Sequence, residues 1–156
     1  MKLALALALM VILGFLFLSR RHVGYPFAGP GYDPAQGVTL EVGKEVFVAV
    51  TEGQYDKGQG KIFLRQLRQV MDSMPENPGL VGFAVRKQIL GRKVWTLSVW
   101  KDEASLSHFL RNQAHRQAVS EGGIPPSTFR SAYTHVSPEE IPFSWQEAVA
   151  LLETAP

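Results

Sequence analysis

The hydrophobic pattern of the chain begins with an unbroken apolar block. Residues 3–18 (LALALALMVILGFLFL) contain no polar side chain, with Lys2 before them and Arg20 and Arg21 soon after. A helix of this length spans about 24 Å, against about 30 Å for a bilayer core. We therefore expect an uncleaved transmembrane anchor over residues 1–19, with a cleaved signal peptide and a buried helix as alternatives. The flanking charges favour a single-pass membrane protein whose C-terminal domain is cytoplasmic.

The next stretch has neither a helical nor a strand period. Residues 20–44 include GYPFAGPGYDPAQG, which is rich in proline and glycine. Such a composition is typical of irregular spacers. The pattern predicts a linker over residues 20–44 and a folded domain over residues 45–156.

The first half of this domain reads as a strand, a helix and two strands. Glu45–Val50 is a β-branched and aromatic run, which predicts a strand. Leu80–Ile89 and Lys93–Trp100 are predicted to pair as a hairpin through a three-residue turn, with Gly91 in a left-handed conformation. Between the first strand and the hairpin, one apolar helical stripe is formed by Phe63, Leu67, Val70, Met71 and Met74.

The hairpin register assigns side chains to the two faces of the predicted sheet. With a three-residue turn, Phe83 lies opposite Val99 on an apolar face that helices should cover. The other face would be small, polar and aromatic, and would remain open. It would carry Arg86, Ser98 and Trp100.

The second half of the domain has clear helix-start signals. Asp102 is predicted to cap one helix, and Asn112 to cap a second after a break. Thr128–Val136 reads as a fourth strand. Ser144 and Glu147 form a capping box that predicts a C-terminal helix.

The element order predicts an α+β protein with a ferredoxin-like β-α-β-β-α-β plan. It would have a four-stranded antiparallel sheet, helices on one face and an extra C-terminal helix. The open face bearing Trp100 would be costly in water. Face-to-face pairing of two copies would cover it, so we expect a homodimer that encloses a cavity.

Composition excludes several function classes. The formal net charge of +2 and the absence of long basic runs argue against nucleic acid as a partner. The chain has no cysteine, which excludes disulfides, thiolate metal sites and a cysteine nucleophile. His108 and His115 are seven residues apart without a third ligand at useful spacing, so no metal site is expected. No phosphate-binding or dinucleotide-binding glycine motif is present.

Two adjoining stretches carry a resemblance to a known family. Gly82–Lys93 (GFAVRKQILGRK) and Trp95–Val119 (WTLSVWKDEASLSHFLRNQAHRQAV) resemble the dimeric α+β barrel superfamily, in particular its antibiotic-biosynthesis-monooxygenase-like group. The likeness covers about residues 45–136. It implies a dimer. The members of this superfamily include cofactor-free oxygenases of quinol-like aromatics, heme-degrading enzymes and proteins without known activity. Heme-degrading members use an Asn on the first strand, whereas this chain has no Asn before Asn77.

The candidate chemistry follows from the faces and from the resemblance. His115 and Arg86 are the candidate catalytic residues, which would take the proton of a phenolic substrate or stabilise its anion. The alternative is a core histidine and a rim ion pair. Candidate substrate-binding residues are Phe47, Ser98, Trp100 and Tyr133.

Two functions therefore remain open. The first is a membrane-anchored oxygenase that oxidises a small aromatic or quinol-type substrate without a cofactor. The second is a non-catalytic module of the same fold that binds a small ligand or a partner.

Overall fold

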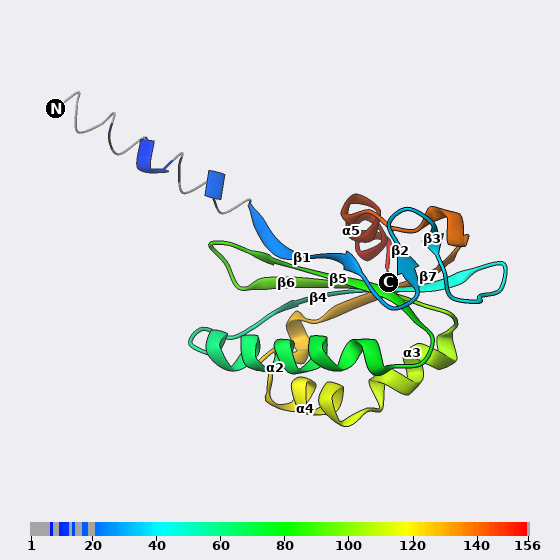
Figure 1. The fold of residues 1–156 in the computed structure, drawn as a ribbon. Helices are drawn as coiled ribbons and strands as arrows, with labels where there is room; N and C mark the ends of the chain where they lie inside the picture. Colours follow the sequence, from blue (N-terminus) through cyan, green and yellow to red (C-terminus); the bar gives the residue numbers. More distant parts are fainter. Residues whose placement is uncertain (1–6, 8–9, 13, 15–16, 19–20, 156) are drawn as a thin grey trace.

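The computed structural model describes residues 7, 10–12, 14, 17–18 and 21–155 (Figure 1). Within these residues, no helix has the length and apolar character needed to cross a membrane. The expected transmembrane helix over residues 1–19 and the single-pass membrane localisation are corrected accordingly. Much of that expected span, residues 1–6, 8–9, 13, 15–16 and 19, lies outside the described residues.

The centre of the fold is an antiparallel sheet of five strands, in the order β1-β5-β6-β4-β7. The expected four-stranded sheet is wrong because β1 forms inside the predicted linker and pairs with β5. Pro26 is compatible with this pairing because β1 is an edge strand. A proline in an edge strand has no N–H, but it need not donate a hydrogen bond to a neighbouring strand. The strands are β1 (His22–Ala28), β4 (Val46–Gln54), β5 (Leu80–Gln88), β6 (Lys93–Trp100) and β7 (Arg130–Val136).

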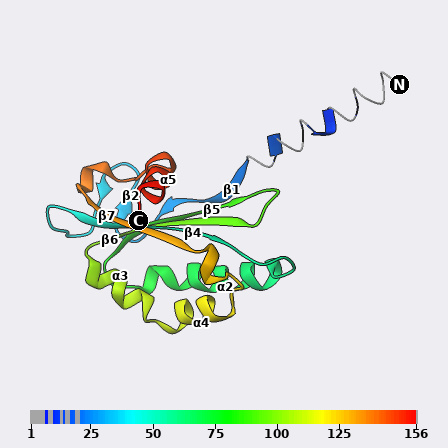
Figure 2. The ribbon, with the colours of Figure 1, turned by 180° about the vertical axis from the view of Figure 1, so that it is seen from behind.

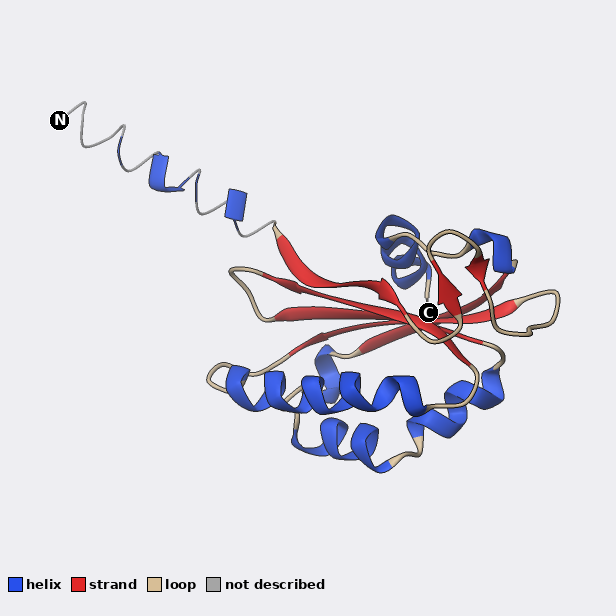
Figure 3. Ribbon diagram, viewed as in Figure 1, coloured by secondary structure: helices blue, strands red, loops and turns tan. Residues whose placement is uncertain are grey.

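Helices lie on both faces of this sheet (Figures 1–3). We call the face under α2, α3 and α4 the helix face, and the opposite face, under α5, the α5 face. A small hairpin of β2 (Tyr32–Asp33) and β3 (Gly37–Val38) lies beside α5 (Figure 1). The ferredoxin-like order and the C-terminal helix are confirmed. The helices are α2 (Gly60–Ser73), α3 (Glu103–Leu110), α4 (Gln113–Glu121) and α5 (Trp145–Thr154), with short 3-10 turns at Met74–Glu76, Pro126–Thr128 and Pro138–Glu140.

The predicted helix caps are present. Asp102 Oδ1 accepts a hydrogen bond from the Ser105 backbone N–H at 2.8 Å. Asn112 Oδ1 accepts one from the His115 backbone N–H at 2.8 Å, which confirms the break between α3 and α4. The Ser144 capping box of α5 is also confirmed. Local sequence therefore determines where these helices begin.

The hairpin register differs from the prediction by one residue. Phe83 lies opposite Ser98, not Val99. The connection spans four residues, Ile89–Arg92, and Gly91 does not have a positive φ. A shift of one residue reverses the face of every side chain on the shifted strand. As a result, Trp100 lies under α3 and not on an open face.

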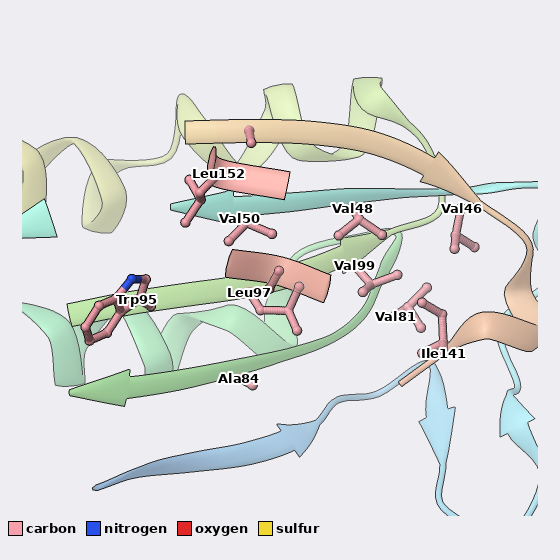
Figure 4. Close-up of a cluster of buried hydrophobic side chains, with 12 residues drawn as sticks. Val46, Val48, Val50, Val81, Ala84, Trp95, Leu97, Val99, Ile141 and Leu152 are labelled. Carbon is pink, nitrogen blue, oxygen red and sulfur yellow. The ribbon is translucent and has the colours of Figure 1, made fainter. Parts of the chain in front are cut away.

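Both faces of the sheet are buried by the chain itself. The α5 face packs against Ala148 and Leu152 of α5, in a cluster that Figure 4 shows from close by. Phe27, Tyr32 and Leu40 from the N-terminal segment also pack against this cluster. The sheet face expected to pair with a second copy is therefore covered. The homodimer stays a prediction, and it would have to use another surface.

Candidate ligand-binding site

All the predicted site residues except Arg86 lie on the helix face. For the residues on strands, the pairing register assigns the face, because residues that lie opposite each other on neighbouring strands point to the same side of the sheet. Ser98 lies opposite Phe83 and Ala49, both of which pack in the core under the helices. The helix-face group is Phe47, Ser98, Trp100, His115 and Tyr133.

Arg86 lies on the α5 face, between two tryptophan rings. Its guanidinium carbon is 4.8 Å from the Trp95 ring centroid and 4.7 Å from that of Trp145, at the start of α5. Burial lowers the pKa of Arg86, while the charge of Glu52 opposes this shift. Cation–π contacts of this kind are favourable when the cation is desolvated. Arg86 therefore connects the start of α5 to the sheet. It does not act beside His115 as expected, because the sheet lies between the two residues.

Trp100 fills space inside the helix-face core. Its exposed fraction is 0%, and its ring stacks on Phe109 of α3 at a centroid distance of 5.2 Å. Its Nε1–H donates a hydrogen bond to Ser98 Oγ at 2.9 Å. The indole is thus satisfied and shielded from solvent, as expected for a core residue.

His115 stands in the first turn of α4 with one ring nitrogen engaged. Nδ1 is 3.3 Å from the Leu110 carbonyl oxygen. A carbonyl only accepts hydrogen bonds, so this contact assigns the proton to Nδ1 and leaves Nε2 as an acceptor. Burial lowers the pKa of His115 from its ordinary value, although the hydrogen bond to Leu110 opposes the shift. The shift favours the neutral imidazole, whose free nitrogen can accept a proton.

A groove opens on the helix face between α3 and strands β4 and β7. Its volume is about 220 Å³. The Phe47 and Tyr133 rings stack with centroids 5.8 Å apart and planes 5° apart, and Tyr133 is 49% exposed. The His135 ring lies 4.9 Å from that of Phe47. The groove, which we call the Tyr133 groove, is lined by Phe47, Glu103, Leu106, Ser107, Leu110 and Tyr133.

Hydroxyl groups add polar character to the helix face. Thr51 on β4 and Thr96 on β6 are hydrogen-bonded with their oxygens 2.6 Å apart. Both residues and Ser98 are only half-buried, although β4 and β6 are internal strands with helices above them. In the sequence, this polar part of the helix face is indicated by small polar residues at alternating positions of β6. It was not predicted because the register was wrong by one residue.

Acidic and histidine side chains do not converge on a metal-binding arrangement in the described residues. No group of three or more His, Asp or Glu side chains there could hold a metal ion. The groups that the Tyr133 groove offers are therefore aromatic faces, the Tyr133 and Ser107 hydroxyls and the Glu103 carboxylate. Such a groove can stack a planar ligand and accept or donate hydrogen bonds.

Comparison with protein families identifies the central part of the chain. Residues 46–121 match the family model described as antibiotic biosynthesis monooxygenase. Residues 46–121 are therefore similar to an antibiotic biosynthesis monooxygenase domain. This confirms the resemblance inferred from the sequence, and we call the segment the ABM-like domain. It begins at β4 and ends with α4, so β1, β7 and α5 lie outside it. The search of curated proteins found no significant match.

Solved structures share the fold at low sequence identity. A protein from Shewanella oneidensis is 12% identical, with a TM-score of 0.53 over 62% of this chain and 95% of that chain. A conserved protein from Methanosarcina mazei is 14% identical, with a TM-score of 0.53 over 58% of this chain and 92% of that chain. A heme-degrading enzyme from Listeria monocytogenes is 12% identical, with a TM-score of 0.55 over 75% of this chain and 71% of that chain. At such identities the likeness concerns the fold alone.

Proposed function

We propose that the protein is an ABM-like oxygenase that binds a small planar phenol or quinol in the Tyr133 groove. The observation that carries the proposal is the exposed Tyr133 ring stacked on Phe47, beside a hydroxyl and a carboxylate. A substrate ring would extend this stack, and its polar groups would meet Ser107 and Glu103 at the rim. The match to a monooxygenase family supports oxidation as the reaction.

His115 is the proposed base. His115 is not a lining residue of the Tyr133 groove, but its Nδ1 contacts the backbone carbonyl of Leu110, which is one. Its neutral Nε2 would take the phenolic proton. The resulting anion would give an electron pair to O₂, form a carbon-bound hydroperoxide and lose water to leave a quinone carbonyl. One oxygen atom enters the product and the other leaves as water, so the reaction balances without a cofactor.

Arg86 has no part in this reaction. It lies across the sheet from the Tyr133 groove and is held between Trp95 and Trp145. The anion would instead rely on the hydroxyl groups of the groove. Stabilisation of developing charge by nearby donors is commonly worth a large share of catalysis.

Oxygen uptake by the full chain tests the proposal. With a panel of phenols and hydroquinones, His115→Gln should lower the rate by about 100-fold or more. His108→Gln, an exposed histidine on α3, is the matched control and should leave the rate unchanged. The wild-type rate should fall only when the pH drops below the ordinary imidazole range, because burial lowers the pKa of His115. Equal loss in both variants would refute the role of His115.

A non-catalytic binding module is the second candidate, and one observation favours it. Trp100 and Phe109 fill the interior between sheet and helix, so the ligand would meet only the rim of the sheet. Phenol binding in the Tyr133 groove without oxygen uptake would establish this function. Binding lost in Tyr133→Ala would assign it to the Tyr133 groove.

A further inference from the structure

A second groove lies on the helix face at the opposite edge of the sheet, between β1 and the C-terminal end of α2. Its volume is about 410 Å³, within the range of small-molecule pockets. Because β1 precedes residues 46–121, the chain adds one wall of this groove to the ABM-like domain. We call it the Tyr25 groove. It is lined by Tyr25, Ala28, Gly29, Pro30, Met71, Asp72, Pro75 and Phe83.

We infer that the Tyr25 groove is a separate binding site for a small aromatic cation, such as an arylalkyl ammonium ion. The inference does not depend on the oxygenase reaction. It combines an aromatic wall, a rigid backbone and one unpaired negative charge.

The aromatic wall is a parallel ring stack. Tyr25 and Phe83 have ring centroids 5.6 Å apart and planes 6° apart. Phe83 is buried, whereas Tyr25 is 46% exposed and presents its outer surface to solvent. An exposed aromatic face attracts both planar rings and cations. Met71 adds a polarisable apolar contact.

The backbone of the wall is fixed by close packing. The register of β1 shifts between Tyr25 and Ala28, as at a β-bulge. A side chain on Gly29 would collide with the backbone of Gly82, so only glycine allows the two strands to approach this closely. Pro30 and Pro75, which also line the groove, each restrict the backbone locally. A groove held in this way loses little entropy when it binds a ligand.

The charge of the Tyr25 groove is negative. Asp72 is the single charged residue of its lining. It lies in the last turn of α2, which carries no basic residue, so the negative end of the helix dipole adds to the carboxylate. In the described part of the chain, the ion pairs belong to Glu52, and Asp72 has none. A cation is therefore the complementary ligand.

The same argument does not extend to the Tyr133 groove. Its acidic residue, Glu103, lies in the first turn of α3, where the positive end of the helix dipole offsets the charge. The two grooves share aromatic rings but differ in electrostatic potential. Ligand charge should therefore separate them.

Amide chemical shifts of the full chain, titrated with benzylammonium, test the inference. Binding should shift Ala28, Gly29 and Asp72, and neutral benzyl alcohol should bind about tenfold more weakly, since it makes neither the cation–π contact with Tyr25 nor the ion pair with Asp72. Asp72→Asn should weaken benzylammonium binding about threefold, as expected for an ion pair with an exposed carboxylate, without changing the affinity for benzyl alcohol. Tyr25→Leu should weaken both ligands.

Two control substitutions check that benzylammonium binds in the Tyr25 groove itself. Glu76→Gln removes a nearby carboxylate that does not line the Tyr25 groove, and it should leave the affinity unchanged. Tyr133→Ala should also leave it unchanged, even if it abolishes phenol binding. Equal loss in Asp72→Asn and Glu76→Gln, or shifts confined to the Tyr133 groove, would overturn the inference.

Discussion

The two faces of the sheet treat their polar groups differently. On the α5 face, Glu52 accepts hydrogen bonds from Lys93, Arg130 and Trp95, and Arg86 is enclosed by aromatic rings. On the helix face, half-buried hydroxyl groups and two edge grooves remain accessible to solvent. The charged groups of the α5 face are held in contacts within the chain, whereas solvent reaches part of the polar surface of the helix face. We therefore propose that the helix face is the functional one.

The largest effect should come from shortening a core side chain of the α5 face. Leu152 is 2% exposed and packs on the sheet. Leu152→Ala should lower the free energy of unfolding by about 2–5 kcal/mol through lost burial and a cavity. Leu64→Ala, on the exposed side of α2, should change it by less than about 0.5 kcal/mol. Urea denaturation measures both, and similar losses would show that Leu152 is not a core residue of the α5 face.

Glu52→Gln should weaken the polar cluster of the α5 face. Burial alone would raise the pKa of Glu52, but hydrogen bonds from Lys93, Trp95 and Arg130 outweigh it and lower the pKa. We expect a loss of about 1–3 kcal/mol at pH 7, a modest value because both basic partners are partly exposed.

The pH dependence of Glu52→Gln gives the sign of this contribution. Because the pKa of Glu52 is lower in the folded state, its stabilisation is complete above the unfolded pKa and is lost as the pH falls through the folded pKa. The unfolding free energy of the wild type should thus decline more steeply in acid than that of the variant. Exposed Glu153→Gln is the control. Parallel curves for Glu52→Gln and the wild type would contradict the assignment.

A smaller effect is expected at the helix break on the helix face. Asn112 caps α4, and its Nδ2 donates to Asn77 Oδ1 at 3.1 Å. Asn112→Ala should cost about 1 kcal/mol, and Asn112→Ser should recover part of it by keeping a cap. Thermal unfolding measures the difference. If the serine variant is no better than alanine, the cap does not stabilise the break.

The smallest change in stability is expected at Tyr133. Its ring is half exposed and stacks on Phe47, so Tyr133→Ala should cost about 0.5 kcal/mol. The same substitution should abolish phenol binding in the Tyr133 groove. Stability and binding would then separate as the two faces suggest. A large loss of stability with intact binding would reverse the assignment of the helix face.

Local sequence signals predicted the helices well. The caps at Asp102, Asn112 and Ser144 each depend on a side chain within three residues of its backbone partner, so no tertiary information is needed. The element order followed from these caps and from the apolar periodicity. The ferredoxin-like plan was therefore accessible from sequence.

Long-range pairing was less accessible. Strand β1 was missed because its proline and glycine content is typical of a loop, and its pairing with β5 depends on an edge more than fifty residues away in sequence. The predicted hairpin register was wrong because the connection is four residues long and Gly91 is not in a left-handed conformation. That single error moved Trp100 and Ser98 to the wrong face.

The candidate site was only partly predictable for the same reason. Phe47 and Tyr133, both chosen as candidate substrate-binding residues, stack on adjacent strands, and their role in binding stays a prediction. Arg86 and His115 were chosen together as the catalytic pair, but Arg86 lies on the α5 face and His115 on the helix face, so the sheet separates them. The Tyr25 groove could not be foreseen, because one of its walls is the strand that the sequence pattern did not reveal.

The pairing of β1 with β5 also sets the limits of a fragment suitable for expression. A version cut at residue 45, where the linker was expected to end, would leave the outer edge of β5 without hydrogen-bond partners and would remove Phe27, Tyr32 and Leu40 from the core. Such a truncated protein should aggregate through that edge. A version that starts at residue 21 keeps the strand and should remain dispersed at the same concentration.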